Sequence, residues 1–599
     1  MTITKESYVD LQEKYEKVKK LIEEDSKLDP VNEPYLSKYN AKQLLIGMKA
    51  NIENLLRSQI PDTKEYVKLT AMFCTVLLYL GRISIETEEL SVGEKHLKKC
   101  MEVASKYKTN PEVILVYLNL LNEFGFLWSE KNPENSKGYL EEAEQLYKEF
   151  KGTGNTPIDI HTLFQANSQE PSESGASDLE KVHTLTNYYL AQIYGALDDP
   201  LRSAVYCHTT LKRQLKTDDY NLIEWALNAA TLSQFFMEKD GFKQARHHLA
   251  ASLYMLDIYE TQLNQHTIHN EEHQAKMENF KHRSADVARC CAKYGLLLLS
   301  NSRNHLMQRS EDIDSTCTIS TDLAKLDLHP GSAVSRESFE DMKFDILDLA
   351  IYENQITDQF VLTLEDARKV FLNIKMWLDR AHTYYTLNNL ASDYIEIVQD
   401  QCQMYSNLLF FEDNIENQAK MHKRRVDLME NVLKEINPIY YMQYCRQIWY
   451  DLAQIYGEIL YVKLDKLKAS KERPTPNILS KINNLVGKGI VYNNNFINSF
   501  VEGNTNELPK TIPQDYEQPF VKAHLSNGAL YSRYITLDKK TSLENVESSL
   551  AFYKKILTYS ENNPKLKETL PTEIGICTEM ASLLPVKIVK LRQDIEPEN

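Results

Sequence analysis

The sequence predicts an all-α protein, a right-handed solenoid of stacked helical hairpins in two halves. Three observations lead to this fold class. The hexapeptide Leu-Ala-Gln-Ile-Tyr-Gly occurs at Leu190–Gly195 and again at Leu452–Gly457. Apolar residues recur at helical spacing along nearly the whole chain, and no long stretch alternates apolar and polar residues as a half-buried strand would. Glycine and proline, at 18 and 19 of 599 residues, are sparse enough for long helices.

Four segments of the N-terminal half share a longer spacing. Each begins with an apolar residue beside a small one, and further small or apolar residues follow at matching distances. These sets are Leu80-Gly81 with Gly93 and Leu97, Phe124-Gly125 with Ser136 and Leu140, Leu190-Ala191 with Ser203 and Cys207, and Leu232-Ser233 with Ala245 and Leu249. The second set is one residue shorter in its expected turn. Because a small residue lets two helices approach closely, the pattern indicates hairpins of the tetratricopeptide kind.

Polar stretches divide the chain into parts. We expect a tetratricopeptide-like solenoid over residues 1–300, with a flexible loop at 151–180 and a polar, histidine-rich connection at 262–274. Residues 301–336 are rich in serine and aspartate, so we expect them to form a flexible connection. The C-terminal helical half then spans 337–599, with a helix break at Asn437-Pro438 and a loop at 503–519 that holds three prolines.

The overall charge bears on the partners. A formal net charge of −16 argues against nucleic-acid binding, which needs a basic surface, and favours a basic partner. We also expect no membrane insertion, because the longest aliphatic run, near Leu296–Leu299, is too short to span a bilayer. The nine cysteines form no Cys-x-x-Cys pair, which is typical of free thiols in a reducing compartment. We therefore expect a cytoplasmic protein.

The chain lacks the motifs of common catalytic sites. It has no Gly-x-x-x-x-Gly-Lys-Ser/Thr loop, no Gly-x-Gly-x-x-Gly, no His-Glu-x-x-His and no Gly-x-Ser-x-Gly. We expect no catalytic residues, no cofactor and no enzymatic activity. A solenoid without a catalytic set usually offers its concave surface to another protein.

Two clusters have both a functional and a structural interpretation. His266, His269 and His273 lie close to Glu271 and Glu272, and imidazole suits zinc or nickel. Their polar surroundings favour a solvated linker, so we expect no metal site. The basic run at Lys420–Arg425 is able to bind phosphate or an acidic patch, or to serve as a localisation signal. We interpret it instead as a solvated helix face that pairs with Glu412, Glu416 and Glu430.

The chain resembles the kinesin-binding proteins (the KIF-binding protein family). The blocks that carry the resemblance follow the family's order: Glu33–Tyr39, Ile85–Cys100, Tyr188–Tyr194, Cys207–Leu215, Ile223–Phe235, Lys420–Arg425, Lys481–Leu485 and Met580–Pro585. The resemblance implies two helical subdomains joined through a long central helix, and a role without catalysis. It also implies that the protein holds the motor domain of kinesins in its concave groove, blocks their binding to microtubules, and is associated with the cytoskeleton. Axonal transport and mitochondrial distribution are the processes that such a role regulates.

Four kinesin-binding residues follow from this resemblance: Tyr189, Gln192, Gln214 and Thr231. The repeat supports part of this set independently. Tyr189 and Thr231 both stand two residues before the small residue of their hairpins, and Gln192 stands one residue after it. These are first-helix positions away from the packing stripe, where the inner groove of a solenoid is lined.

The expected mechanism is competition. Kinesin motors meet acidic tubulin through a basic surface, so an acidic groove is able to cover that surface. The alternative is a tetratricopeptide-type adaptor or co-chaperone that binds an extended peptide. This mode needs a clamp of Lys, Arg and Asn on successive first helices, whereas the predicted groove positions hold Gln, Tyr and Thr. Neither the oligomeric state nor the choice of kinesin follows from the sequence.

Overall fold

The computed structural model describes residues 5–165, 173–265, 270–311, 342–469, 474–501 and 512–595. All regular elements in these ranges are helices, which confirms the predicted all-α class. The chain divides into two compact units. Among the described residues, unit 1 comprises 5–165, 173–265, 270–283 and 342–354, and unit 2 comprises 284–311, 355–469, 474–501 and 512–595.

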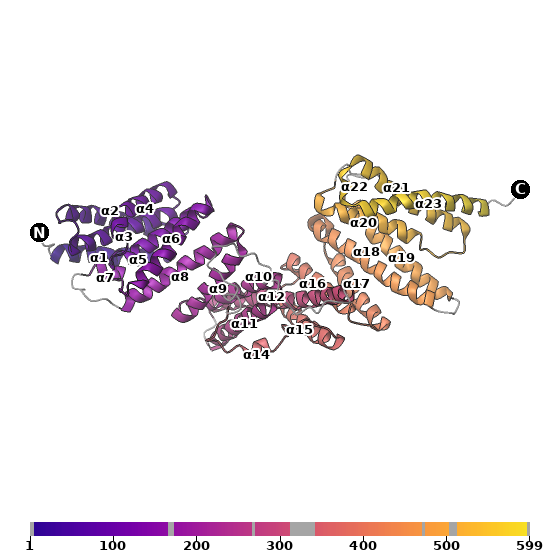
Figure 1. Cartoon of the computed structure of the whole chain (residues 1–599), viewed down its shortest axis with the longest axis horizontal. Helices are drawn as coiled ribbons and strands as arrows, with labels where there is room; N and C mark the ends of the chain where they lie inside the picture. Colours follow the sequence, from indigo (N-terminus) through magenta and orange to yellow (C-terminus); the bar gives the residue numbers. More distant parts are fainter. Residues whose placement is uncertain are drawn as a thin grey trace. The chain divides into compact units, whose positions relative to one another are not determined.

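Unit 1 is a series of helices that pack as consecutive antiparallel pairs (Figure 1). Its helices are α1 (Lys5–Glu23), α2 (Leu36–Arg57), α3 (Lys64–Glu86), α4 (Leu90–Ala104), α5 (Ile114–Trp128), α6 (Pro133–Gly152), α7 (Ile160–Leu163), α8 (Glu173–Ala196), α9 (Pro200–Thr217), α10 (Leu222–Glu238), α11 (Phe242–Gln265) and α14 (Ala350–Glu353). Short 3-10 turns lie at Asp25–Leu28 and Ser105–Tyr107.

The small residues of the repeat lie where the two helices of a hairpin meet, as predicted. A Cβ atom on Gly81 of α3 would lie 2.4 Å from Leu97 Cδ2 of α4, so only glycine fits this approach. In the third hairpin Ser203 Oγ donates a hydrogen bond of 2.7 Å to the Ala191 carbonyl. In the second, Ser136 Oγ donates at 2.6 Å to the Gly125 carbonyl. Each small residue therefore marks the closest approach of a hairpin.

The turns of three hairpins share one backbone geometry. Glu88, Asp198 and Asp240 each lie two residues beyond a first helix and take a left-handed conformation, with φ of 66°, 59° and 55°. The next amide in each case donates back to the fifth residue before it, at 2.7 Å in the first turn, 2.9 Å in the second and 2.8 Å in the third. This bond belongs to the Schellman motif that closes a helix. The predicted shorter turn after α5 differs, since Asn132 N–H donates to the Trp128 carbonyl at 2.9 Å.

Helix α3 is the centre of the large apolar core formed by the N-terminal helices of unit 1. Its apolar residues, from Leu69 to Ile83, pack with α2, α4 and α5 into one buried cluster. By length and composition alone it is the single helix in the described ranges able to cross a membrane, but 83% of its most apolar window is buried inside the unit. This degree of burial is typical of a core helix in a helical bundle.

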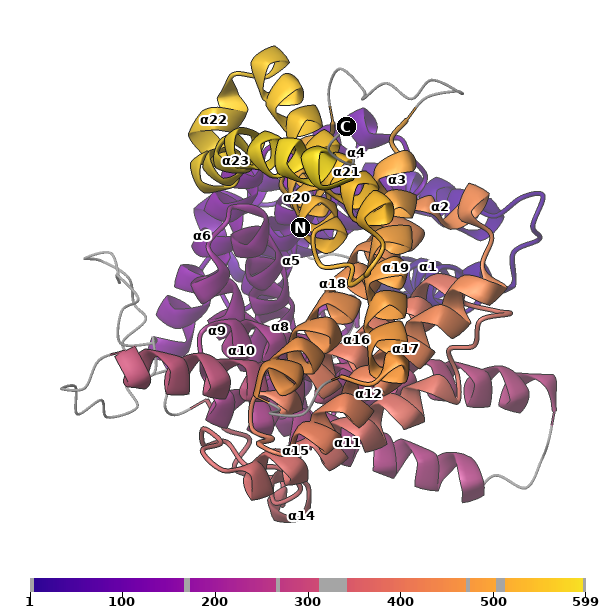
Figure 2. The same cartoon turned by 90° about the vertical axis from the view of Figure 1, so that its right-hand side faces the viewer.

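Unit 2 is also a series of packed helices, among which α18 and α19 lie side by side (Figure 2). Its helices are α15 (Leu364–His382), α16 (Ala391–Leu409), α17 (Ile415–Glu435), α18 (Pro438–Ala469), α19 (Pro476–Asn498), α20 (Gln514–Tyr531), α21 (Lys539–Asn562), α22 (Lys565–Thr569) and α23 (Pro571–Ile595). The long helix α12 (Glu271–Glu311) contains the boundary between Arg283 and Ser284. The break at Asn437-Pro438 is confirmed, because α17 ends at Glu435 and α18 begins at Pro438.

Several predicted loops are shorter than expected. Glu173–Glu180 forms the start of α8, where Gly175 fits against Pro157: a Cβ there would lie 2.1 Å from the Pro157 carbonyl oxygen. Residues 301–311 continue α12, and 514–519 begin α20, whose first turn carries acidic residues that suit a helix N-terminus. Residues 262–265 and 271–274 are likewise helical. The remaining parts 166–172, 266–269, 312–336 and 503–511 lie outside the described residues.

The basic run on α17 is only partly a solvated face. Lys420, Lys423 and Arg424 are exposed, but His422 and Arg425 are buried. Arg425 donates to Glu458 of α18 at 2.6 Å, not to the acidic residues expected from the sequence. Those residues have other partners: Glu412 pairs with Arg368, and Glu430 accepts hydrogen bonds from Tyr456 and Tyr492.

Candidate protein-binding surface

A row of equivalent positions runs across the first helices of the unit 1 hairpins. The positions stand two residues before and one residue after the small packing residue. They are Tyr79 and Arg82 on α3, Glu123 and Phe126 on α5, Tyr189 and Gln192 on α8, and Thr231 and Gln234 on α10. We call these eight residues the first-helix row. Because the small residue faces the second helix of its hairpin, the flanking positions turn away from that contact.

Direct contacts join the row across the first three of these helices. Arg82 of α3 and Glu123 of α5 form an ion pair of 2.6 Å. The ring of Phe126, also on α5, lies 6.2 Å from that of Tyr189 on α8. Burial, followed by the negative charge of Glu123, raises the pKa of Tyr189. The phenol is therefore neutral at physiological pH and available as a hydrogen-bond donor.

Two aromatic side chains at Tyr189 are open to solvent, one from the row and one beside it. Phe126 is 52% exposed, and Tyr188, whose ring lies 5.7 Å from that of Tyr189, is 40% exposed. We call Phe126, Tyr188 and Tyr189 the aromatic patch. Aromatic side chains supply large contact areas at low entropic cost and are enriched in protein interfaces.

A hollow of about 330 Å³ lies beside the aromatic patch. Tyr188 of α8, Gln214 of α9 and Asn228 of α10 all line it. The turn between α9 and α10 fixes its far end, since Asp218 adopts the left-handed conformation and the Asn221 side chain caps α10 by accepting from two backbone amides. Gln192 and Thr231 are exposed about one helical turn beyond Tyr188 and Asn228 on the same helix faces.

The structure thus brings the four predicted residues to one region. Gln214 lines the hollow, Gln192 and Thr231 flank it, and Tyr189 belongs to the adjoining aromatic patch. Their role in binding stays a prediction. Sequence analysis missed Phe126 and Tyr188. Phe126 had a signal, because it follows Gly125 as Gln192 follows Ala191.

The charge of this region is mixed, not acidic as expected. Arg82 and Glu123 neutralise one another, and the hollow is lined by Lys181 as well as Asp219 and Glu224. No group of three or more His, Cys, Asp or Glu residues suited to a metal ion occurs in the described part of the chain, and His266 and His269 of the sequence candidate lie outside it. The side chains at hand are suited to hydrogen bonding and aromatic contact.

A helical-hairpin solenoid with exposed aromatic and amide side chains along its first helices belongs to the class of proteins that bind other proteins. Comparison with known proteins makes this specific. Residues 223–591 match the family described as KIF-1 binding protein C terminal. The KIF-binding protein of Drosophila melanogaster is 36% identical over 600 residues, covering 98% of both chains. That of Homo sapiens is 32% identical over 597 residues, covering 94% of this chain and 95% of the human one.

A solved structure supports the same relationship. The structure titled "Cryo-EM map of KIFBP" matches with a TM-score of 0.65 and 28% sequence identity, covering 98% of this chain and 99% of that one. The chain therefore belongs to the KIF-binding protein family. The relatives are named as binding proteins, in keeping with the lack of catalytic motifs in the sequence.

Proposed function

We propose that this protein binds kinesin motor domains through the first-helix row and the adjoining hollow, and that binding keeps the motors from microtubules. The names of its relatives support kinesin as the partner. The observation that carries the proposal is the continuity of the row, in which Arg82, Glu123, Phe126 and Tyr189 connect three successive hairpins. A surface of this extent suits a folded domain better than a short peptide.

Inhibition in this proposal is steric and involves no catalysis. A motor whose microtubule-facing surface lies against the row is unable to reach tubulin. Because the row itself is nearly neutral, the aromatic patch supplies the contact energy and governs dissociation. The net charge of −16 acts at longer range, where it attracts the basic motor surface and speeds association. We place this activity in the cytoplasm, at the cytoskeleton, where it regulates microtubule-based transport.

Co-sedimentation tests the proposal. A kinesin motor domain is mixed with microtubules and the full-length chain, and the pelleted motor is measured. We expect the wild-type chain to leave the motor in the supernatant and the Tyr189→Ala/Gln192→Ala variant to restore pelleting. A matched control is Tyr39→Ala/Gln43→Ala, which removes an exposed Tyr and Gln from α2, outside the row. We expect this control to inhibit like the wild type.

Two results would contradict the proposal. If several motors pellet normally in the presence of the wild-type chain, the protein does not inhibit them, and binding of extended peptides becomes the reading to test. If the wild type inhibits and Tyr189→Ala/Gln192→Ala inhibits equally well, the motor is held elsewhere.

A further inference from the structure

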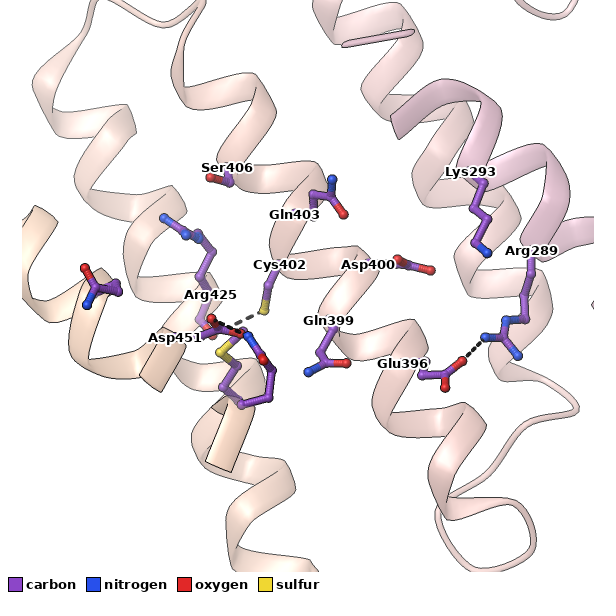
Figure 3. Close-up of a pocket in the computed structure, with 13 residues that line it drawn as sticks. Arg289, Lys293, Glu396, Gln399, Asp400, Cys402, Gln403, Ser406, Arg425 and Asp451 are labelled. Atoms are coloured by element: carbon purple, nitrogen blue, oxygen red, sulfur yellow. Dashed lines mark hydrogen bonds and ion pairs between the residues drawn. The ribbon is translucent and has the colours of Figure 1, made fainter. Parts of the chain in front are cut away.

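Unit 2 contains a separate polar groove of about 590 Å³. Helices α12, α16, α17 and α18 line it (Figure 3). The helix α16 contributes a continuous stripe, Glu396, Gln399, Asp400, Gln403 and Ser406, at the spacing of one helix face. Three residues of α18, Gln447, Asp451 and Gln454, form a second stripe. None of these residues belongs to the first-helix row or to unit 1.

The arginines of the groove are already paired. Arg289 of α12 contacts Asp393 at 2.7 Å and Glu396 at 2.5 Å. Arg425 on the floor contacts Glu458 at 2.6 Å. Lys293, the third cation, is exposed on α12 and is not within ion-pair distance of any described carboxylate. The positive charge deep in the groove is therefore compensated.

Two carboxylates of the groove, Asp400 and Asp451, are not compensated in the same way. Asp400 makes no hydrogen bond or ion pair with any other described residue, and it lies on the α12 side of the α16 stripe (Figure 3). Asp451 lies on the opposite side of the stripe, on α18, and accepts one hydrogen bond of 3.0 Å from Gln447 of its own helix. Both carboxylates are half-buried. Neither carboxylate forms a direct ion pair with a described cation, so burial removes hydration that no direct contact with a cation replaces.

Amide groups between the two carboxylates are free as well. Across the described residues, Gln399 and Gln403 of α16 and Gln454 of α18 have no hydrogen-bond partner. Each side-chain amide offers two donors and one acceptor oxygen, the same groups that a polypeptide backbone needs as partners. The groove therefore presents a row of unused peptide-binding groups flanked by two anions.

The side chains that line the groove argue against a small organic ligand and against thiolate chemistry. It contains no aromatic residue and only one methionine, whereas sites for small organic molecules are mostly apolar and aromatic. Burial raises the pKa of the Cys402 thiol to about 12, so this cysteine is not a thiolate nucleophile or metal ligand at physiological pH.

We propose that this groove binds an extended segment of a partner protein that carries lysine or arginine side chains. The basic side chains reach Asp400 on one side of α16 and Asp451 on the other, while the free glutamine amides hydrogen-bond the backbone of the segment between them. Charge complementarity selects a basic segment over an acidic one. The inference is independent of the proposed function, because it uses no residue of unit 1.

The titration of the two carboxylates supports this assignment. Burial raises the pKa of Asp400 to about 6, against the lowering effect of Lys293 and Arg289 and with a raising effect from Glu396. Burial also raises the pKa of Asp451 to about 6, against Gln447 and Arg425 and with Glu458. A bound basic side chain stabilises the charged form of both. Binding should therefore strengthen as the pH rises through about 6.

Fluorescence anisotropy of the full-length chain at physiological salt tests the proposal. The probe is a fluorescein-labelled peptide of Gly-Lys-Ser repeats, compared with the same peptide carrying Glu in place of Lys. We expect saturable binding of the lysine peptide only, and a loss of at least about tenfold in affinity in Asp400→Asn/Asp451→Asn, because hydrogen bonds to charged groups are stronger than those between neutral groups. The matched control, Asp413→Asn/Asp427→Asn, changes the net charge equally at exposed sites of the same unit and should bind like the wild type.

Each other outcome overturns the proposal. The groove is not the site if the lysine peptide fails to bind, or if Asp400→Asn/Asp451→Asn and the control bind it equally. Equal binding of the acidic peptide removes the charge argument. If spermine displaces the peptide at concentrations close to the Kd of the lysine peptide, the groove recognises a free polyamine and not a protein segment.

Discussion

Replacing Gly125 with alanine tests whether the close approach of α5 and α6 stabilises this hairpin. A Cβ atom at this position would lie 2.5 Å from Leu140 Cδ2 and 2.7 Å from Leu140 Cγ. Carbon atoms in contact prefer about 3.5–4.0 Å, so one partner must move by about 1 Å. Leu140 is fully buried and packs against Leu190, Ile193 and Tyr194, which leaves it no space to retreat. The two helices must therefore separate.

The expected change in the stability of the hairpin follows from two opposing effects of the Gly125→Ala substitution. Overpacking of a core costs about 1–3 kcal/mol. Alanine is favoured over glycine inside a helix by about 0.8–1.0 kcal/mol, which offsets part of that cost. The same hairpin supplies a matched control in Gly138 of α6, where an added Cβ meets no atom within 4 Å. Gly138→Ala should gain the helix-propensity term alone, so the two variants should differ by about 1–3 kcal/mol in the local stability of the hairpin.

Hydrogen exchange of the α5 and α6 amides in the full-length chain measures this difference locally. It does not require the whole chain to unfold in one step, which a chain of two units is not expected to do. A difference of about 1.4 kcal/mol corresponds to tenfold in the exchange rate. We expect these amides to exchange faster in Gly125→Ala than in Gly138→Ala, by about fivefold to 150-fold. Exchange in Gly125→Ala as slow as in Gly138→Ala would refute the packing argument.

Three further predictions concern binding and stability. Phe126→Ala/Tyr188→Ala should raise the dissociation rate of a bound motor domain, with a loss of about 1–3 kcal/mol seen in biolayer interferometry, and unchanged dissociation would remove the aromatic patch from the interface. Raising the salt concentration through the physiological range should slow association and leave dissociation nearly constant in the same assay, because the net charge acts at long range. Acidification should weaken unit 1, since burial lowers the pKa of His208 to about 3 and that of His248 well below 6.5. The native state keeps both neutral, so stability is full above pH 6.5 and falls by up to about 1.4 kcal/mol per pH unit for each histidine as the pH drops below 6.5 toward 3. Protection factors of the α9 and α11 amides, in which the exchange rates are corrected for the pH dependence of intrinsic exchange, should fall between neutral and mildly acidic pH, and pH-independent protection factors would contradict the prediction.

The hairpins could be predicted from the sequence because small residues recur in the repeat wherever the two helices of a hairpin approach closely. Gly81 and Gly125 are glycines because Leu97 and Leu140 occupy the space that a Cβ would need, and Ser203 is small and polar because it bonds the Ala191 carbonyl. Even the shorter turn after α5 was visible as a missing residue. Contacts within one hairpin lie close together in sequence and recur, so a single chain reveals them.

The features that the sequence did not predict depend on contacts that occur once and do not recur with the repeat. Polar composition suggested a loop through Glu173–Glu180, but Gly175 lets the first turn of α8 fit against Pro157. Arg425 pairs with Glu458 on the next helix. The prediction that it pairs with acidic residues nearer in the sequence was wrong. Phe344 is similar: it is fully buried among His208, Trp225 and His248, although nothing in its own sequence neighbourhood indicates a core position.

The candidate binding surface depends both on contacts within a hairpin, which recur in the repeat, and on contacts between hairpins, which do not. This explains which of its residues could be predicted from the sequence. A position such as that of Tyr189 or Phe126 is oriented by the small residue beside it, so the repeat places it on the open side of its hairpin. Whether it then contributes depends on the neighbouring hairpin, because Phe126 and Tyr189 meet only through the packing of α5 against α8. Gly125 permits the packing of α5 against α6, and Leu140 of α6 packs in turn against Leu190 and Ile193 of α8, so the two contacts are linked. A change in that packing should alter partner binding even where no contact residue is touched.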